Sequence, residues 1–215
     1  MKRFQPLFLS LLLSLSACVP VAMIAGGSGG MMALHDRRSI GTQTDDEGIE
    51  WKAIQQVPEK YASVSHKNYT SFNRRVLITG EAPNESVRQG IGDAVLAIKG
   101  VKEVYNEMVL GENSSLASRS NDSYITSKVK GKLVDTKNLS ANHIKVITEA
   151  GVVYLMGIVN AHEAQLATEA ARVVSGVKKV VSLFEIVSEE ETRQIDESMK
   201  GSANTSSSNV LQTEN

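Results

Sequence analysis

The sequence predicts an α+β fold in which two small domains follow one another, each with the element order αββαβ. The main observation is a segment that occurs twice, with strand and helix patterns in the same order each time. A second observation is that aromatic residues make up only 5% of the 215 residues. Few aromatic side chains leave little bulk for each core, which suits two small domains better than one large domain.

The first seventeen residues have the pattern of a secretory signal peptide. Lys2 and Arg3 give a positive start, residues 4–15 form an apolar run, and the letters LSAC occupy positions 15–18. The run is too short to span a bilayer, which needs about 20 apolar residues. LSAC is the lipobox pattern of bacterial lipoproteins. We therefore expect cleavage before Cys18, the only cysteine, and a triacylated N-terminus there.

Val19 follows the expected lipidation site. In enteric-type lipoproteins, which this N-terminus resembles, an aspartate at that position retains the protein in the inner membrane. Val19 therefore favours the periplasmic face of the outer membrane. Residues 18–40 are expected to be the lipidated N-terminus and a flexible, glycine-rich linker. Within it, residues 26–30 match a serine nucleophile motif in letters only, because four glycines supply neither the strand nor the helix that motif needs.

The net charge argues against nucleic acid as a partner. The whole chain carries a formal charge of −1, and loss of Lys2 and Arg3 with the signal peptide leaves 21 basic against 24 acidic residues, or −3. A weakly acidic chain has no global attraction to nucleic acid or to an anionic membrane. Any such binding must come from a local patch.

Two glycines mark each copy of the repeat. In the first copy an apolar, β-branched run ends at Gly80, and the letters GVKEV start 20 residues later at Gly100. In the second copy the run ends at Gly157, and GVKKV starts 19 residues later at Gly176. We expect Gly80 and Gly157 to end a strand, and Gly100 and Gly176 to cap the C-terminus of the helix between them.

The helix inside the second copy has both a start signal and a packing face. Asn160 followed by Glu163 predicts a capping box. Small apolar residues then form a narrow stripe suited to lying close against a sheet: Ala164, Ala167, Ala170, Ala171 and Val174.

Each copy is preceded by another helix. In the second copy it is expected over residues 122–135, capped by Asn121 or Asp122, and is followed by a strand at 144–148 and a tight turn at 149–151. In the first copy Pro58 should cut this helix short. Each copy therefore follows the order helix, strand, strand, helix, strand.

Several motifs in this order resemble the BON domain. They are the letters RSIGTQTDD at 38–46, VYNE at 104–107, SND at 120–122, and VYLMG at 153–157. Two such domains behind a lipobox resemble the dual-BON outer-membrane lipoproteins of Gram-negative bacteria. The resemblance covers residues 36–188 and implies BON domains at 41–112 and 117–188. Residues 189–215 are expected to be a short helical extension and then a disordered tail.

No catalytic constellation is evident, so we expect no enzyme activity, no cofactor and no metal site. The four histidines are far apart in the sequence and are expected to be solvated. The acidic run 45–47 is expected to be a solvated helix start. Three lysines at 128, 130 and 132 lack the interleaved aromatics of a nucleic-acid surface.

The helix that opens the second copy has one unusual face. Counting 100° per residue, Ile125, Val129 and Leu133 form its core side. The opposite side holds residues that a solvated face does not need, with a lysine at its flank: Tyr124, Ser127, Gly131, Val134 and Lys128. Gly131 alone costs a helix up to about 1 kcal/mol relative to alanine.

Two interpretations of this face remain open. Tyr124 and Val134 either pack against the first copy as a domain interface, or enter the headgroup layer of a membrane while lysines meet anionic headgroups. The BON resemblance implies the second, because dual-BON lipoproteins are associated with anionic-phospholipid binding through this helix, and Tyr124 stands at its aromatic position.

The expected function is therefore non-catalytic: binding of an anionic, phosphatidylglycerol-like phospholipid, which supports outer-membrane integrity. The alternative is a protein-interaction module that docks on outer-membrane assembly or cell-wall machinery. Its partners would then be envelope proteins.

Overall fold

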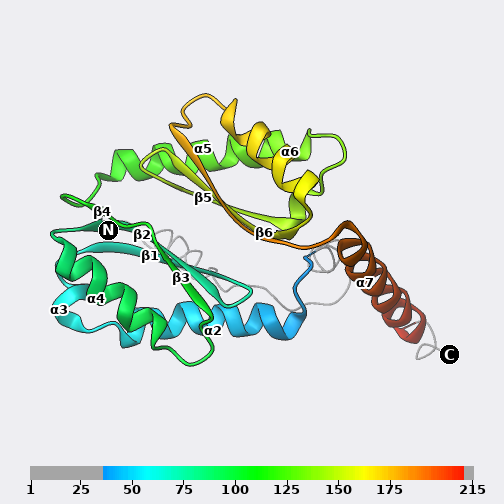
Figure 1. Ribbon diagram of the computed structural model, residues 1–215, viewed down its shortest axis with the longest axis horizontal. Helices are drawn as coiled ribbons and strands as arrows, with labels where there is room; N and C mark the ends of the chain where they lie inside the picture. The colour runs from blue at the N-terminus through cyan, green and yellow to red at the C-terminus, as the bar shows by residue number, and fades with distance from the viewer. Residues whose placement is uncertain (1–35, 211–215) are drawn as a thin grey trace, which may run out of the picture. The chain divides into compact units, whose positions relative to one another are not determined.

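The structure is a computed structural model that describes residues 36–210 and contains two domains of the same order (Figure 1). The first domain consists of α2 (Ile40–Gln56), α3 (Glu59–Ala62), β1 (His66–Phe72), β2 (Arg75–Ala82), α4 (Glu85–Leu96), β3 (Glu103–Asn106) and β4 (Val109–Leu110). As expected, the first helix ends before Pro58, which begins the short α3.

The second domain repeats this order and is followed by one more helix. Its elements are α5 (Leu116–Val134), the 3₁₀ turn η1 (Ala141–His143), β5 (Ile144–Glu149), β6 (Val152–Val159), α6 (Ala161–Arg172) and β7 (Lys179–Ile186), with α7 (Glu189–Val210) after them. The predicted αββαβ order is therefore confirmed in both copies. The capping box of Asn160 and Glu163 at the start of α6 is confirmed as well.

Both sheets have the same topology. The second strand is central: β2 pairs antiparallel with β1 and parallel with β3 and β4, and β6 pairs antiparallel with β5 and parallel with β7. The helices of each domain lie on one face of their own sheet, with α2 and α4 on the first and α5 and α6 on the second (Figure 1).

The central strands are apolar on both faces. In β2, Val76 and Ile78 belong to the core under the first domain's helices, and Leu77 between them points to the other side. This other side contributes to an apolar cluster shared by both domains, here called the junction cluster. Its buried members are Phe72, Leu77, Tyr154, Met156 and Ile158. Side chains alternate between the two faces of a strand. One face of each central strand therefore packs in the core of its own domain, and the other face packs in the cluster that joins the domains.

The repeated glycines lie elsewhere than predicted. Gly80 and Gly157 are inside β2 and β6, which continue two residues further. A Cβ on Gly157 would lie 2.5 Å from the carbonyl oxygen of His143, the last residue of η1 before β5. The close approach of this neighbouring backbone, not strand termination, therefore requires glycine at position 157. Gly100 and Gly176 have positive φ but stand three residues beyond the true C-caps, in the turn that follows each helix.

A buried aspartate in the first helix of each domain holds the following hairpin. Asp122 accepts hydrogen bonds from the backbone N–H groups of Ala150 (2.9 Å) and Gly151 (2.8 Å). Asp46 does the same for Asn73 (2.8 Å) and Arg74 (2.7 Å). All four turn residues have positive φ, as a two-residue type I′ hairpin turn requires.

Two sequence expectations about these aspartates were wrong. The run 45–47 is not a solvated helix start, since α2 begins at Ile40 with Ser39 as its cap and Asp46 is 2% exposed. Similarly, α5 begins at Leu116, capped by Ser115, whereas Asn121 or Asp122 was expected to cap it. Tertiary hydrogen bonds to the hairpin, invisible in the local sequence, explain why Asp122 is inside the helix.

The segment expected to be a flexible linker is fixed near its end. Arg37 is 6% exposed and forms ion pairs with Glu163 of α6 (2.7 Å) and Asp196 of α7 (2.8 Å). Burial acts to lower the pKa of Arg37, but its hydrogen bonds to Asp196 and Glu163 outweigh burial and raise it. The linker prediction for residues 37–40 is therefore wrong.

The helical extension predicted after residue 188 is present but longer than expected, since α7 is helical from Glu189 to Val210, so the prediction of a disordered tail is wrong up to residue 210. Ser188 accepts a hydrogen bond from the N–H of Glu191, and three glutamates in the first turn favour a helix start. Ile195 packs against the junction cluster. Packing of the first turns of α7, through Thr192 and Ile195, thus stabilises the start of a helix whose composition is polar.

Candidate functional site

The solvent face of α5 has the composition predicted for it. Ile125, Val129 and Leu133 are buried against the second sheet. On the other side Tyr124 is 62% exposed and Val134 is 69% exposed. The remaining predicted site residues are Ser127 and Gly131, both exposed, and the half-buried Lys128.

The exposure of this face excludes one of the two sequence interpretations. Tyr124 and Val134 do not pack against the first domain, since most of each side chain is open to solvent. The main packing partners of α5 are β5, α6 and η1, which belong to its own domain. A Cβ on Gly131 would meet no atom within 4 Å, so no packing contact explains the glycine.

Lys128 connects the face to the end of α6. Its ammonium lies 4.8 Å from the centre of the Tyr124 ring, within cation–π distance. It also donates a hydrogen bond to the carbonyl oxygen of Ser175, in the turn after α6. These two contacts hold the lysine beside the aromatic ring, so a positive charge and an apolar group are presented together.

Sequence reasoning missed two exposed apolar residues of this surface. Leu116 is 74% exposed and stands 18 residues, or five full turns, before Val134, so both point the same way. The predicted start of this helix at Asp122 lies after Leu116, so the sequence prediction does not include Leu116 in the face. Val173, at the C-cap of α6, is 72% exposed, close in sequence to the Ser175 carbonyl that Lys128 contacts. No local pattern marked Val173.

The charge of α5 is one-sided. Its basic residues are Arg119, Lys128, Lys130 and Lys132. Its only acidic residue is Asp122, which is buried and engaged by the hairpin. Between Leu116 and Val134 the helix therefore shows solvent apolar and basic side chains, with no carboxylate among them, and the exposed Asp135 follows at its C-cap.

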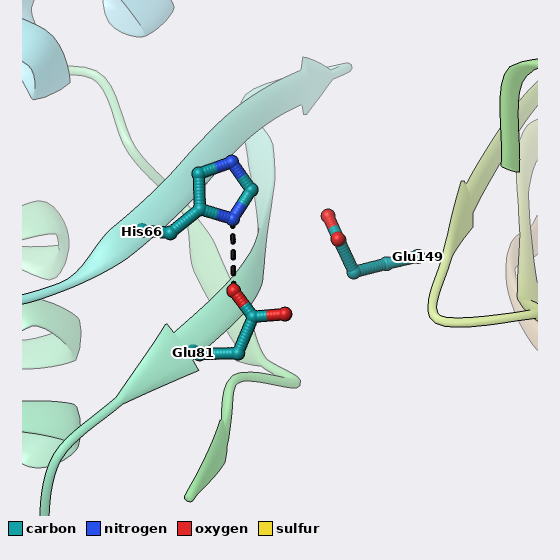
Figure 2. A group of neighbouring side chains, drawn as sticks. All are labelled: His66, Glu81 and Glu149. Atoms are coloured by element: carbon teal, nitrogen blue, oxygen red, sulfur yellow. Dashed lines mark hydrogen bonds and ion pairs between the residues drawn. The ribbon is translucent and has the colours of Figure 1, made fainter. Parts of the chain in front are cut away.

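A second group of polar side chains lies between the two domains. His66 Nδ1 is 2.9 Å from a carboxylate oxygen of Glu81, and Glu149 of the second domain points toward both (Figure 2). The expectation of solvated histidines is thus wrong for His66, which is half-buried, and for His143, which is 8% exposed. His162 is exposed as expected, and His35 lies outside the described residues.

The predicted lipidation site, Cys18, lies outside the described residues, as do the signal peptide and most of the linker. Across residues 36–210, no helix combines the length and apolar character needed to cross a membrane.

Comparison with known proteins identifies both repeats. The BON domain model matches residues 45–112 and 121–188. The chain is 38% identical over 173 residues to the outer membrane lipoprotein DolP of Haemophilus influenzae, covering 79% of this chain and 89% of that protein. It is 37% identical over 155 residues to the 21 kDa hemolysin of Actinobacillus pleuropneumoniae, covering 71% and 79%. Osmotically-inducible protein Y of Escherichia coli matches at 25% identity, covering 74% and 81%.

Proposed function

The chain belongs to the BON-domain family, and from that premise we propose that it is a non-catalytic outer-membrane lipoprotein, anchored through Cys18, whose α5 face binds anionic phospholipid. The similarity to an outer membrane lipoprotein over most of the chain supports the location. The lipobox at residues 15–18 supports the anchor. Phospholipid contact would support the integrity of the membrane that holds the anchor.

The observation that carries the lipid proposal is the solvent face of α5, which from Leu116 to Val134 is apolar and basic without an exposed acid. Tyr124, Val134 and Leu116 are exposed along it. Aromatic and aliphatic side chains of this kind enter the headgroup layer, while flanking lysines are attracted to anionic lipid by about 1 kcal/mol each. The preferred headgroup class is therefore anionic, such as phosphatidylglycerol.

The decisive test is Tyr124→Glu in a fragment of residues 34–215, which lacks the anchor, so that only the folded part can bind vesicles. A carboxylate at this position would face anionic headgroups. We expect flotation with phosphatidylglycerol vesicles to be lost and the melting temperature to stay unchanged, because Tyr124 is exposed.

The matched control is Trp51→Glu, which introduces the same charge at an exposed aromatic residue of α2. It should leave flotation intact. Intact flotation of the Tyr124→Glu fragment, or equal loss in both variants, would reject the assignment to α5.

A second candidate function, docking of an envelope protein, is favoured by α2. Trp51 (61% exposed) and Ile54 (62% exposed) are neighbours on its outer side. Asp45 and Glu47 are exposed on the same helix, which disfavours anionic lipid there. A photo-crosslinking residue at position 51 in intact cells tests this candidate: a discrete protein adduct supports it, and crosslinking to lipid alone rejects it.

A further inference from the structure

Three side chains that bind metals in other proteins converge between the two domains. His66 is at the start of β1, Glu81 is near the end of β2, and Glu149 ends β5 of the second domain. Their nearest ligand atoms all lie within 4.8 Å of one another, and Figure 2 shows the three side chains directed toward a common point.

Burial makes this arrangement unusual. Glu81 is 5% exposed and Glu149 is 8% exposed. The carboxylate of Glu149 accepts hydrogen bonds from Asn68 (3.0 Å) and Thr79 (3.1 Å), which are neutral donors. Among residues 36–210, no lysine or arginine forms an ion pair with it. Two buried carboxylates facing one imidazole repel each other unless a shared cation compensates them.

The internal repeat shows that the fold does not require these carboxylates. Phe72 and Glu149 each immediately precede the hairpin turn of their domain, so they are equivalent. Glu81 and Ile158 each follow the close-approach glycine of their central strand, so they are equivalent too. Phe72 and Ile158 are both in the junction cluster. Where the residue before the turn comes from the first domain and the residue after the glycine comes from the second, both are apolar: Phe72 and Ile158. Where the two domains exchange these roles, both residues are acidic: Glu149 and Glu81.

We propose that His66, Glu81 and Glu149 bind a zinc ion between the two domains. One imidazole nitrogen and two carboxylate oxygens are donors that Zn²⁺ accepts, with a fourth position left for water. Ligand atoms at about 2.0–2.2 Å from zinc are roughly 3.3 Å apart in a tetrahedron. His66 and Glu81 are already 2.9 Å apart, so the larger adjustment falls on Glu149, whose side chain closes the site.

The site draws ligands from both domains, so zinc would couple their stabilities. His66 and Glu81 belong to the first domain, and Glu149 belongs to the second. A surface depression lined by Asn68, Arg119 and Glu149 gives solvent a route to this carboxylate. A metal bound only by the native arrangement raises the melting temperature as its concentration rises.

The test is a titration of the full mature chain in detergent, purified without a polyhistidine tag, with Zn²⁺ and separately with Mg²⁺. We expect one zinc per chain at micromolar concentration, no comparable Mg²⁺ binding, and a melting temperature that rises with zinc. His66→Gln and Glu149→Gln should each weaken zinc binding by at least about tenfold and abolish the thermal shift. His162→Gln removes an exposed histidine and should change neither measurement.

Glu149→Gln serves as a second variant if His66→Gln fails to fold. The position equivalent to Glu149 in the first domain is occupied by the apolar Phe72, so we expect the fold to tolerate loss of the negative charge of Glu149. Retained zinc binding in a folded Glu149→Gln chain would overturn the proposal. Absence of zinc binding by the unmodified chain, or equal loss in His162→Gln, would overturn it as well.

Discussion

Each domain begins with a long helix, α2 in the first and α5 in the second, and the two helices share their inward side. Asp46 and Asp122 are both buried and accept hydrogen bonds from the hairpin turn. Ile49 and Ile125, three residues later, are both buried in the core. The hairpin and the sheet below it impose these residue types, because unpaired turn N–H groups or a cavity would destabilise either domain.

The outward sides of the same helices differ. On α2, exposed Trp51 and Ile54 share the helix with exposed acidic residues. On α5, exposed Tyr124 and Val134 share the helix with lysines, and its single aspartate is buried. The difference teaches that the fold constrains the inward residues of both helices and leaves the outward residues free to differ.

The largest expected effect comes from removing the shared aspartates. Asp46→Ala should lower the free energy of unfolding by about 3–5 kcal/mol, because Asp46 also pairs with Arg38 and accepts a hydrogen bond from Ser71. Asp122→Ala should cost less, about 2–3 kcal/mol, because only two backbone donors lose their partner. Chemical denaturation measures both. Asp45→Ala, at an exposed neighbour, should change little, and equal costs at positions 46 and 122 would contradict this ranking.

The next largest effect concerns the ion pairs that link Arg37 to α6 and α7, which have no counterpart in the first domain among the described residues. Arg37→Met leaves Glu163 and Asp196 without their shared cation and should lower stability by about 2 kcal/mol, less than a fully buried pair would because Asp196 is partly exposed. Hydrogen exchange should become faster in α7. The equivalent position in α4 is Val87, so the first domain has no such tie. Arg119→Met, at an exposed arginine, is the control, and unchanged exchange in α7 would refute the tie.

A smaller effect distinguishes the outward sides of the two helices. Lys130→Gln on α5 should weaken binding of phosphatidylglycerol vesicles by about fivefold, equivalent to roughly 1 kcal/mol for one lysine near an anionic surface. The loss should shrink at high salt. Lys52→Gln removes an exposed lysine from α2 and should leave binding unchanged. Cosedimentation at two salt concentrations compares them, and equal losses would mean that both helices contact lipid.

The smallest effect is a pH dependence located in the second domain. Burial lowers the pKa of His143 below its ordinary value of 6.5, and the charge of Arg37 lowers it further, against the opposing Asp196, Glu163 and Asp36. Because the folded pKa is depressed, the stability of neutral His143 is fully present above about pH 6.5 and is lost as pH falls through the folded pKa.

Denaturation at pH 7.5 and pH 5.5 measures this dependence. We expect a loss of under about 1 kcal/mol that His143→Gln reduces and His162→Gln does not. An identical pH slope in the unmodified chain and the His143→Gln chain would contradict the assignment. Protonation of Glu163, whose pKa Arg37 lowers despite burial, would add to the loss only at more acidic pH.

The sequence by itself determined the repeat, the αββαβ order and the two faces of α5. These follow from local rules: Asn160 and Glu163 are three residues apart, and Ile125, Val129 and Leu133 recur at the helical period. Periodicity also identified Tyr124 as outward-facing, because a residue's direction on a helix depends only on its spacing. The beginning of α5 was missed, since Ser115 and Asp122 are both acceptable caps by local criteria.

Only the tertiary structure decided what the polar residues do. Asp46 and Asp122 are inside their helices because a hairpin some 27 residues away needs acceptors. Gly157 is needed because the carbonyl of His143 approaches it. Arg37 meets Glu163 and Asp196 across more than a hundred residues, and the junction cluster joins residues of both domains. His66, Glu81 and Glu149 meet only when the two domains are together. A contact between residues far apart in the sequence depends on packing, so no spacing in the sequence predicts it.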